Sequence, residues 1–563
     1  MSGSLRGMAA HGCVMAALAA LLAHAARAVD CGAPGSPSTP SPLLCGAQAV
    51  LQRGVLLDLT LGGLLALGLA AASLLLALLP ALVRRRPPVY LVDFSVFNPD
   101  PSWTFTRDDV RRCAAGGGLA EEDLALLCKL AYRSGLGDDT AVPPKPRAVY
   151  MSGELGGHKP GIELAREEYE QTCFPCVEEL LAKTGVKPSQ IGFVITNSSL
   201  FNPTPSLSAA LINRFKLRDD TINYSLGGMG CSAGVVALDL ARQMLQLHPG
   251  SYALVVSHEN ITNNYYLGKD KSMLLPNVLF RSNGSAVLLS SAPADAPKSK
   301  YTLTHVVRTI MAADDEAYRC IWQTDDEARN QGVSLKKELI GVAGRCLARN
   351  MGRLGPKVLP VSEQAKYAGN ALLRAALKAA PAGTEALVPE GWRKPYTPDF
   401  GKAFDAVCIH TGGRGVIDSM EQNLGMGKAK VEASRAALYE FGNTSSCSVW
   451  YELAYAESFG GLRRGARVWQ IAFGSGFKCN SAVLVANRTV KDMHAAWGSF
   501  DRAKMYAQLE QIDKEVAESR ARRAAEKAAA PAAGAGAAGA AGAAAGAAVG
   551  AAPAAPPAPV AAS

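Results

Sequence analysis

The stretch Asn223-Tyr-Ser-Leu-Gly-Gly-Met-Gly-Cys-Ser-Ala-Gly234 joins a glycine-dense turn to an apolar segment of helical length. Gly227, Gly228 and Gly230 permit backbone angles that are closed to other residues and leave space for a ligand beside the turn. A cysteine at a helix N-terminus lies at the positive end of the helix dipole, which can lower its thiol pKa to roughly 3.5–7.5. The stretch therefore predicts that Cys231 is a nucleophile. The alternative is a buried structural thiol, which is a common role of cysteine.

Short apolar strand candidates alternate with amphipathic segments of helical length between residue 87 and about residue 487. The expected strands are 191–196, 252–257, 285–289, 403–409, 468–473 and 481–485. The expected helices are 162–183, 232–246, 335–351, 369–380 and 448–458. This alternation predicts that the fold class is α/β.

Two short sequence echoes indicate an internal duplication. Gly284-Ser-Ala-Val-Leu-Leu289 resembles Asn480-Ser-Ala-Val-Leu-Val485, and each stretch lies at a strand candidate. Gly230-Cys-Ser-Ala233 resembles Ser446-Cys-Ser-Val449, and each stretch precedes a helix candidate. Matches this short also arise by chance, so alone they indicate a repeat only weakly.

The composition is that of a globular protein with a membrane contribution. The chain has 563 residues, of which 48% are hydrophobic and 19% charged, so two packed units with appendages are expected. Its formal charge is +9, but the basic residues are dispersed and no nucleic-acid-binding motif is present, so no nucleic-acid partner is expected. Residues 528–563 are almost wholly Ala, Gly and Pro, which predicts a disordered tail.

The N-terminal region, residues 1–86, contains two apolar segments. The segment 59–83 has no charged residue and spans roughly 37 Å as a helix, which is long enough to cross a bilayer core of about 30 Å. Three arginines at 84–86 follow it, so the positive-inside rule predicts that the rest of the chain faces the cytosol. The segment 8–23 is either a first membrane helix or a signal-peptide core. A buried core helix is the alternative for 59–83.

Three further positions could complete a reaction centre around the cysteine. His410 ends an apolar strand candidate, where α/β proteins place functional side chains, and its alternative role is a core histidine. Asn443 lies in a polar turn before a helix candidate, and helix capping is its alternative role. The turn Gly474, Ser475 and Gly476 could aim backbone N–H groups at an oxyanion, or could be an ordinary β-turn.

Other polar candidates are interpreted as structural. Cys173-Phe-Pro-Cys176 has no second cysteine pair at a suitable spacing to complete a zinc site. Asp93, Glu259 and the Asp314-Asp315 pair are expected to be solvated or structural, not general acids. No metal site is therefore predicted.

Five stretches carry a resemblance to a known family: 226–234, 259–262, Ser199-Leu-Phe-Asn-Pro-Thr-Pro-Ser-Leu-Ser-Ala209, Phe441-Gly-Asn-Thr-Ser-Ser446 and Ala472-Phe-Gly-Ser-Gly-Phe-Lys-Cys-Asn-Ser-Ala482. They resemble the 3-ketoacyl-CoA synthases of plant-type fatty acid elongases, which are membrane-bound, thiolase-like condensing enzymes. Matches of this length are specific, and the resemblance covers nearly all of residues 87–487.

The resemblance implies a five-layer αβαβα fold of two similar halves, preceded by one or two membrane helices. The half with the nucleophile would span 87–300 and the half with the histidine and asparagine 301–490. A tail that is helical and then disordered would cover 491–563. The family also implies a homodimer anchored in the endoplasmic reticulum membrane, with its catalytic part in the cytosol. The apolar run 253–256 adds modest support for a buried interface, and a core strand within one subunit is an equally ordinary explanation of it.

The implied activity is the decarboxylative condensation of a long-chain acyl-CoA with malonyl-CoA in very-long-chain fatty acid elongation, without a further cofactor. Cys231 would carry the acyl group, while His410 and Asn443 would bind the malonyl thioester carbonyl. Backbone N–H groups of Cys231 and of residues 474–476 would bind the oxyanion of the acyl-transfer step. The reductase and dehydratase subunits of an elongase are implied partners. The alternatives are a type III polyketide synthase and a catalytically silent elongase scaffold.

Four positions depart from the family pattern. Further histidines usual in plant members are replaced here at positions that look like Ile310, Ala406 and Tyr439, and a cysteine of the family is Ser198. The missing groups are therefore interpreted as peripheral to the chemistry.

Overall fold

The computed structural model describes residues 73, 86–153, 159–381, 383 and 388–529. The chain divides into two compact units, Met1–Arg86 and Pro87–Ser563, and the second holds the fold considered below. The expected segment 8–23, all of 59–83 except Ser73, and residues 530–563 of the expected tail lie outside the described residues. Within the described ranges, no helix is long and apolar enough to cross a membrane.

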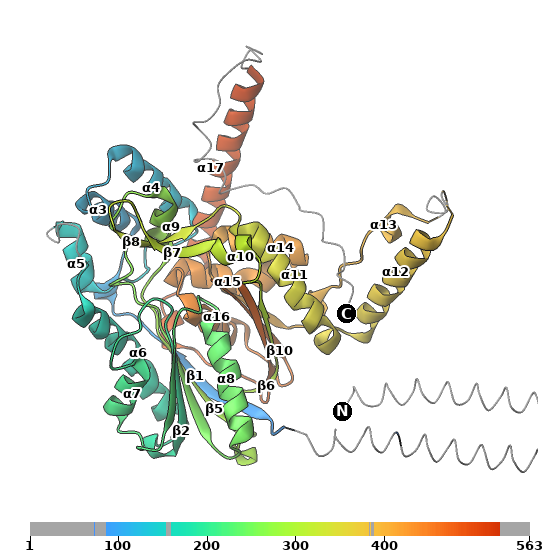
Figure 1. The fold of residues 1–563 in the computed structure, drawn as a ribbon, viewed down its shortest axis with the longest axis horizontal. Coiled ribbons are helices and arrows are strands. Elements are labelled where there is room, and N and C mark those ends of the chain that lie inside the picture. Colours follow the sequence, from blue (N-terminus) through green and yellow to red (C-terminus); the bar gives the residue numbers. More distant parts are fainter. Residues whose placement is uncertain (1–72, 74–85, 154–158, 382, 384–387, 530–563) are drawn as a thin grey trace, which may run out of the picture. The chain divides into compact units, whose positions relative to one another are not determined.

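The fold is built on a mixed sheet whose strand order is β3-β2-β4-β5-β1-β6-β11-β10-β9 (Figure 1). The strands of the first part are β1 (Val89–Val96), β2 (Ile191–Asn197), β3 (Ile222–Leu226), β4 (Tyr252–Ser257) and β5 (Ser285–Ser290). Those of the second part are β6 (Tyr301–Ile310), β9 (Ala406–Ile409), β10 (Arg467–Gly474) and β11 (Lys478–Ala486). A separate hairpin joins β7 (Ile321–Asp325) to β8 (Gln331–Leu335).

The same strand arrangement occurs twice in this sheet. In the first part, β2 is parallel to β4, β4 is antiparallel to β5, and β5 is antiparallel to β1. In the second part, β9 is parallel to β10, β10 is antiparallel to β11, and β11 is antiparallel to β6. The two echo segments of the sequence fall on the equivalent strands β5 and β11. The parts join where Val89–Leu91 of β1 pairs with Tyr301–Leu303 of β6.

Helices cover both parts. α8 (Ala233–Leu247) and α16 (Ser448–Tyr455) contact strands of both parts, whereas α6 (Ile162–Thr184) contacts strands of the first part and α11 (Leu339–Val358) those of the second (Figure 1). The remaining helices are α3 (Arg107–Gly116), α4 (Glu121–Arg133), α5 (Pro144–Ser152), α7 (Leu207–Phe215), α9 (Lys271–Leu279), α10 (Asp315–Arg319), α12 (Val361–Ala379), α13 (Glu390–Arg393), α14 (Arg414–Leu424), α15 (Lys428–Phe441) and α17 (Arg502–Ala529). The predicted α/β class is confirmed.

Strand β4 explains why the centre of the sheet forms where it does. Its residues Ala253, Leu254, Val255 and Val256 have no exposed surface, because helices lie on both faces and β2 and β5 flank the strand. Burial of each valine or leucine contributes roughly 1.5–3 kcal/mol. The interpretation of this run as support for a subunit interface is therefore wrong, since a single chain buries it completely. The sheet edge is instead β3, whose residues 222–225 are exposed.

Candidate active site

Cys231 lies in the turn between β3 and α8, two residues before the helix begins at Ala233. Gly230 has a φ of 69°, in the left-handed region that favours glycine. A Cβ atom at Gly230 would lie 2.3 Å from the backbone nitrogen of Ser475, so the two turns approach too closely for any side chain there. The glycines before Cys231 thus serve both the turn and the contact with a second turn.

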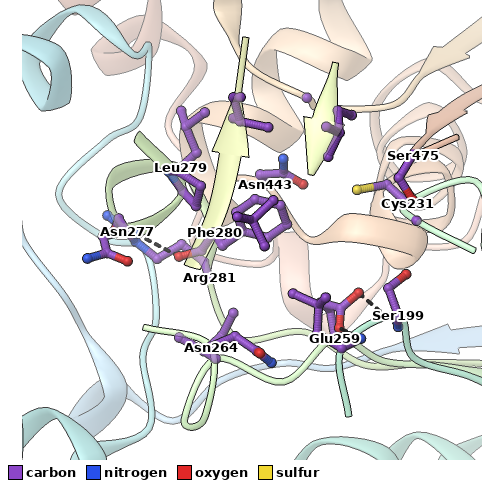
Figure 2. Close-up of a pocket in the computed structure, with 18 of the residues that line it drawn as sticks. Ser199, Cys231, Glu259, Asn264, Asn277, Leu279, Phe280, Arg281, Asn443 and Ser475 are labelled. Carbon is purple, nitrogen blue, oxygen red and sulfur yellow. Dashed lines mark hydrogen bonds between the residues drawn. The ribbon is translucent and has the colours of Figure 1, made fainter. Parts of the chain in front are cut away.

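This second turn, 474–476, connects β10 to β11. Gly474 and Ser475 line the same cavity as Cys231, and Figure 2 shows Cys231 and Ser475 side by side on its wall. Gly476 does not line this cavity. Lys478 Nζ donates to the carbonyl of Ser475 over 2.7 Å, which holds the turn against β11. The turn is thus close enough to Cys231 to offer N–H groups to a ligand on the sulfur.

The cavity has a volume of about 310 Å³, and Cys231, His410 and Asn443 all line it. Residues from both parts of the fold form it: the loops after β2 and β4, the hairpin β7–β8, α11 and α14. Most of the wall away from the three side chains is apolar, including Leu279, Ile321, Val333, Leu335, Ile340 and Val416. A space of this kind suits an apolar chain that reaches a polar reaction centre.

His410 directly follows β9, and its N–H donates to the carbonyl of Ile471 in β10 over 2.9 Å. Its ring Nδ1 lies 3.0 Å from Ser448 Oγ. Burial lowers the pKa of His410 to about 4, although a hydrogen bond to the carbonyl of Ser445 acts in the opposite direction. The side chain is therefore neutral at neutral pH, with one ring nitrogen unprotonated.

Asn443 is held by backbone pairing with the segment after α9. Its N–H donates to the carbonyl of Leu279 over 2.8 Å, and its carbonyl accepts from the N–H of Arg281 over 3.2 Å. Its side-chain Oδ1 accepts from the N–H of Ser445 over 2.8 Å. Because that oxygen is occupied, the amide NH₂ is the end left for a ligand; Figure 2 shows the side chain at the cavity.

The structure corrects the expectation that the helix end lowers the pKa of the nucleophile. Cys231 is half-buried and lines the cavity, and desolvation of its thiol raises the pKa of Cys231 to about 12. A hydrogen bond from Ser445 acts to lower it, and the nearby Glu259 carboxyl acts to raise it. Desolvation is the largest of these contributions and outweighs the hydrogen bonds that favour the thiolate. Cys231 therefore rests as a neutral thiol and needs a base.

Glu259 was expected to be solvated or structural. It is 3% exposed and lines the cavity, so it is not solvated, and its contacts fit the structural alternative. It accepts hydrogen bonds from Ser198 Oγ, the N–H groups of Ser199 and Leu200, and Ser445 Oγ, at 3.0–3.2 Å. Four donors offset the cost of burying this carboxyl. Its place in the motif 259–262 was the one available signal.

Three of the four positions that depart from the family pattern lie away from the reaction centre, whereas Ser198 donates to the cavity-lining Glu259. Ile310 is 58% exposed at the end of β6, and neither it nor Ala406 or Tyr439 lines the cavity. The cysteine pair Cys173 and Cys176 is buried within α6, where Cys176 Sγ donates to the carbonyl of Thr172 over 3.1 Å. This burial agrees with the structural interpretation of that pair.

Comparison with known proteins gives a consistent result. The FAE1/Type III polyketide synthase-like protein family matches residues 81–376, and the C-terminal family of 3-oxoacyl-[acyl-carrier-protein] synthase III matches 401–486. The chain is 49% identical to 3-ketoacyl-CoA synthase 4 of Arabidopsis thaliana over 75% of its own length and 78% of that protein, and 47% identical to 3-ketoacyl-CoA synthase 2 over 74% and 77%.

Solved structures agree on the fold alone. The crystal structure of PKS-I from the brown alga Ectocarpus siliculosus has a TM-score of 0.54 at 17% identity and covers 72% of this chain and 99% of its own. A type III pentaketide synthase from Neurospora crassa gives 0.53 at 17% identity, with coverage of 71% and 99%.

Proposed function

Because this chain belongs to the FAE1/type III polyketide synthase-like family, we propose that it is a 3-ketoacyl-CoA synthase that condenses a long-chain acyl-CoA with malonyl-CoA. The products are 3-ketoacyl-CoA, CO₂ and CoA, and no further cofactor takes part. The observation that carries the proposal is that Cys231, His410 and Asn443 meet at one cavity whose remaining wall is mostly apolar. A polyketide synthase of the same fold is disfavoured by the 47–49% identity to 3-ketoacyl-CoA synthases.

In the first half-reaction, the thiol proton of Cys231 passes to His410 and the thiolate attacks the acyl thioester. The negative charge on the carbonyl oxygen is stabilised by the N–H groups of Cys231 and of the 474–476 turn. The carbon–sulfur bond to CoA then breaks, which leaves the acyl group on Cys231. A thiol with a pKa of about 12 does not ionise unaided at neutral pH, so it needs a proton acceptor, and His410 lines the same cavity.

In the second half-reaction, protonated His410 and the amide of Asn443 donate hydrogen bonds to the thioester carbonyl of malonyl-CoA. Loss of CO₂ leaves its electron pair on an enolate, which these donors stabilise by several kcal/mol. The enolate carbon attacks the acyl carbonyl, and the sulfur of Cys231 leaves and regains its proton from His410. The released CoA thiolate takes a proton from water, so the cycle balances.

The proposal extends to location and assembly. We place the protein in the endoplasmic reticulum membrane through 59–83, with the catalytic unit in the cytosol beside the reductase and dehydratase that would process a 3-ketoacyl-CoA. A homodimer would form through the edge strand β3, where Ile222 and Tyr224 are 39% and 37% exposed and backbone groups await a partner. Protease treatment of sealed microsomes tests the topology, and light scattering in detergent tests the dimer; a protected catalytic unit or an active monomer would contradict them.

The activity is tested with microsomes that express the chain, supplied with acyl-CoAs of graded length and radiolabelled malonyl-CoA. Labelled 3-ketoacyl-CoA should appear for long acyl chains and be absent in a matched Cys231→Ala preparation. Product from a single short starter extended several times would favour the polyketide synthase. The absence of any product from a folded protein would favour the scaffold.

A further inference from the structure

Ser445 has an unusual backbone for its position. It lies in the turn between Asn443 and α16 with a φ of 49°, a left-handed conformation in which non-glycine residues are strained. It is 1% exposed, so no contact with solvent explains the conformation. Strain of this kind persists where the surrounding structure requires it.

Each polar group of Ser445 bonds to a different part of the reaction centre. Its N–H donates to Asn443 Oδ1 over 2.8 Å. Its carbonyl accepts from Ser448 Oγ over 2.7 Å and is also hydrogen-bonded by His410. Its hydroxyl donates to Glu259 over 3.2 Å and bonds to the thiol of Cys231. A right-handed conformation would turn these groups in other directions.

The carbonyl of Ser445 decides which nitrogen of His410 carries the proton. A carbonyl oxygen can only accept, and the single hydroxyl proton of Ser448 is already donated to it. Ser448 Oγ, the atom beside Nδ1, is then an acceptor toward the ring, so Nδ1 is the protonated nitrogen. The other nitrogen, Nε2, then has a free electron pair. Since His410 lines the cavity, this electron pair is available to the thiol proton.

The N–H and the hydroxyl complete the assignment. An N–H can only donate, so the Asn443 atom that faces it is the oxygen, and the amide NH₂ remains for the substrate. The hydroxyl has one proton, which it gives to Glu259 while Cys231 is a thiol. When the sulfur becomes a thiolate, rotation about the C–O bond brings that proton to the sulfur without movement of the backbone.

We propose that Ser445 is a positioning residue that sets the polarity of all three catalytic groups through its N–H, its carbonyl and its hydroxyl. The inference rests on the proposed condensation. Its chemical content is one proton transfer: the S–H bond of Cys231 breaks, an N–H bond forms at His410 Nε2, and Nδ1 keeps its proton throughout. Ser448 supports this by filling the space between the Ser445 carbonyl and Nδ1.

The test measures alkylation of Cys231 by iodoacetamide as a function of pH, by mass spectrometry of its peptide, in the full-length protein in detergent. Ser445→Gly removes the hydroxyl but accepts the left-handed backbone, so relief of strain opposes loss of the hydrogen bond to Glu259 and the unfolding temperature should change little. Ser448→Ala removes the hydroxyl beside His410. We expect both variants to alkylate about tenfold more slowly at pH 7 and to reach the wild-type rate only at higher pH.

Ser446→Ala is the matched control, since Ser446 is the next residue and similarly buried, and its profile should equal that of the wild type. Wild-type profiles in both Ser445→Gly and Ser448→Ala, with normal unfolding temperatures, would overturn the proposal. Alkylation needs no acyl-CoA or malonyl-CoA. An altered profile in an enzyme that makes no 3-ketoacyl-CoA would therefore contradict the proposed function and leave the role of Ser445 standing.

Discussion

Cys231 and Cys447 occupy equivalent places in the two parts of the fold, and only one of them faces a cavity. Each precedes a helix, α8 or α16, that contacts strands of both parts. Cys447 has no exposed surface, and its thiol donates to the carbonyl of Ser257 and to Asn283 Oδ1 at 3.1 and 3.3 Å. Burial raises the pKa of both thiols. The helix start is thus common to both parts, and the open space with a neutral histidine distinguishes the reactive one.

The largest effect should come from removing the thiol on the cavity side. Cys231→Ser should lower condensation by roughly 10⁴- to 10⁶-fold, the range seen when a covalent nucleophile is lost. A serine hydroxyl is a weaker acid than the thiol and a poorer leaving group. Turnover is measured with labelled malonyl-CoA, and normal thermal unfolding shows that the variant is folded. Activity within tenfold of the wild type would remove Cys231 from the mechanism.

The second prediction separates the two residues that the second part supplies to the cavity. His410→Ala should slow both acylation of Cys231 and condensation, because the raised thiol pKa requires a base. Asn443→Ala should leave acylation intact and lower condensation by about 10²- to 10³-fold, as for loss of one oxyanion donor. Acylation is followed by labelling with radioactive acyl-CoA. Equal labelling of the two variants would restore the sequence-based expectation that both act only on malonyl-CoA.

The third prediction concerns how the stability of the protein depends on pH through a cavity histidine, His410, and a core histidine, His258. Burial lowers the pKa of both His410 and His258 to about 4, from an ordinary value near 6.5. Between these values the unfolded chain binds more protons than the native one, so native stability falls as the pH decreases from 6.5 to 4. Each histidine accounts for about 3 kcal/mol over this window.

Urea unfolding at pH 7 and pH 4.5 measures this loss. His410→Asn should lessen it, and a variant that loses as much stability as the wild type would show that His410 is not neutral in the native state.

The smallest effect on activity should come from substitution of Cys447, the buried cysteine of the pair. Cys447→Ala should cost about 1 kcal/mol of unfolding free energy, because it removes one sulfur from a closed site. Its condensation activity should stay within about twofold of the wild type. Urea unfolding and the same turnover assay measure the two quantities. A loss comparable to that of Cys231→Ser would mean that the two cysteines share a function that their surroundings conceal.

The elements predicted from the sequence are those with strong local patterns. The expected strand 252–257 coincides with β4, and the expected helix 162–183 differs by one residue from α6 despite Pro175. Strand β3 was not expected, because its exposed edge position leaves no apolar alternation. Helices α3 and α4 were also missed, since they pack against loops and other helices whose positions only the tertiary fold defines.

The site was predicted to the level of residue type and not of environment. Cys231, His410 and Asn443 were candidates because each lies at a strand end or a helix start, and the family resemblance implied their roles. The predicted lowering of the Cys231 pKa was wrong, because the surroundings of the thiol include residues far away in the chain, such as Glu259 and Ser445. The left-handed backbone of Ser445 has no local sequence signal, since serine rarely adopts it.

The contact between Gly230 and the turn after β10 also has a consequence for the order of synthesis. The loop of Cys231 belongs to the first part, but the backbone against which it rests belongs to β10 and β11, the last two strands of the sheet to leave the ribosome. A nascent chain that ends before residue 474 contains Cys231 but lacks the turn that would bind the oxyanion. Without that turn the cavity is incomplete. The reaction centre is therefore complete only when β10 and the turn after it have been synthesised.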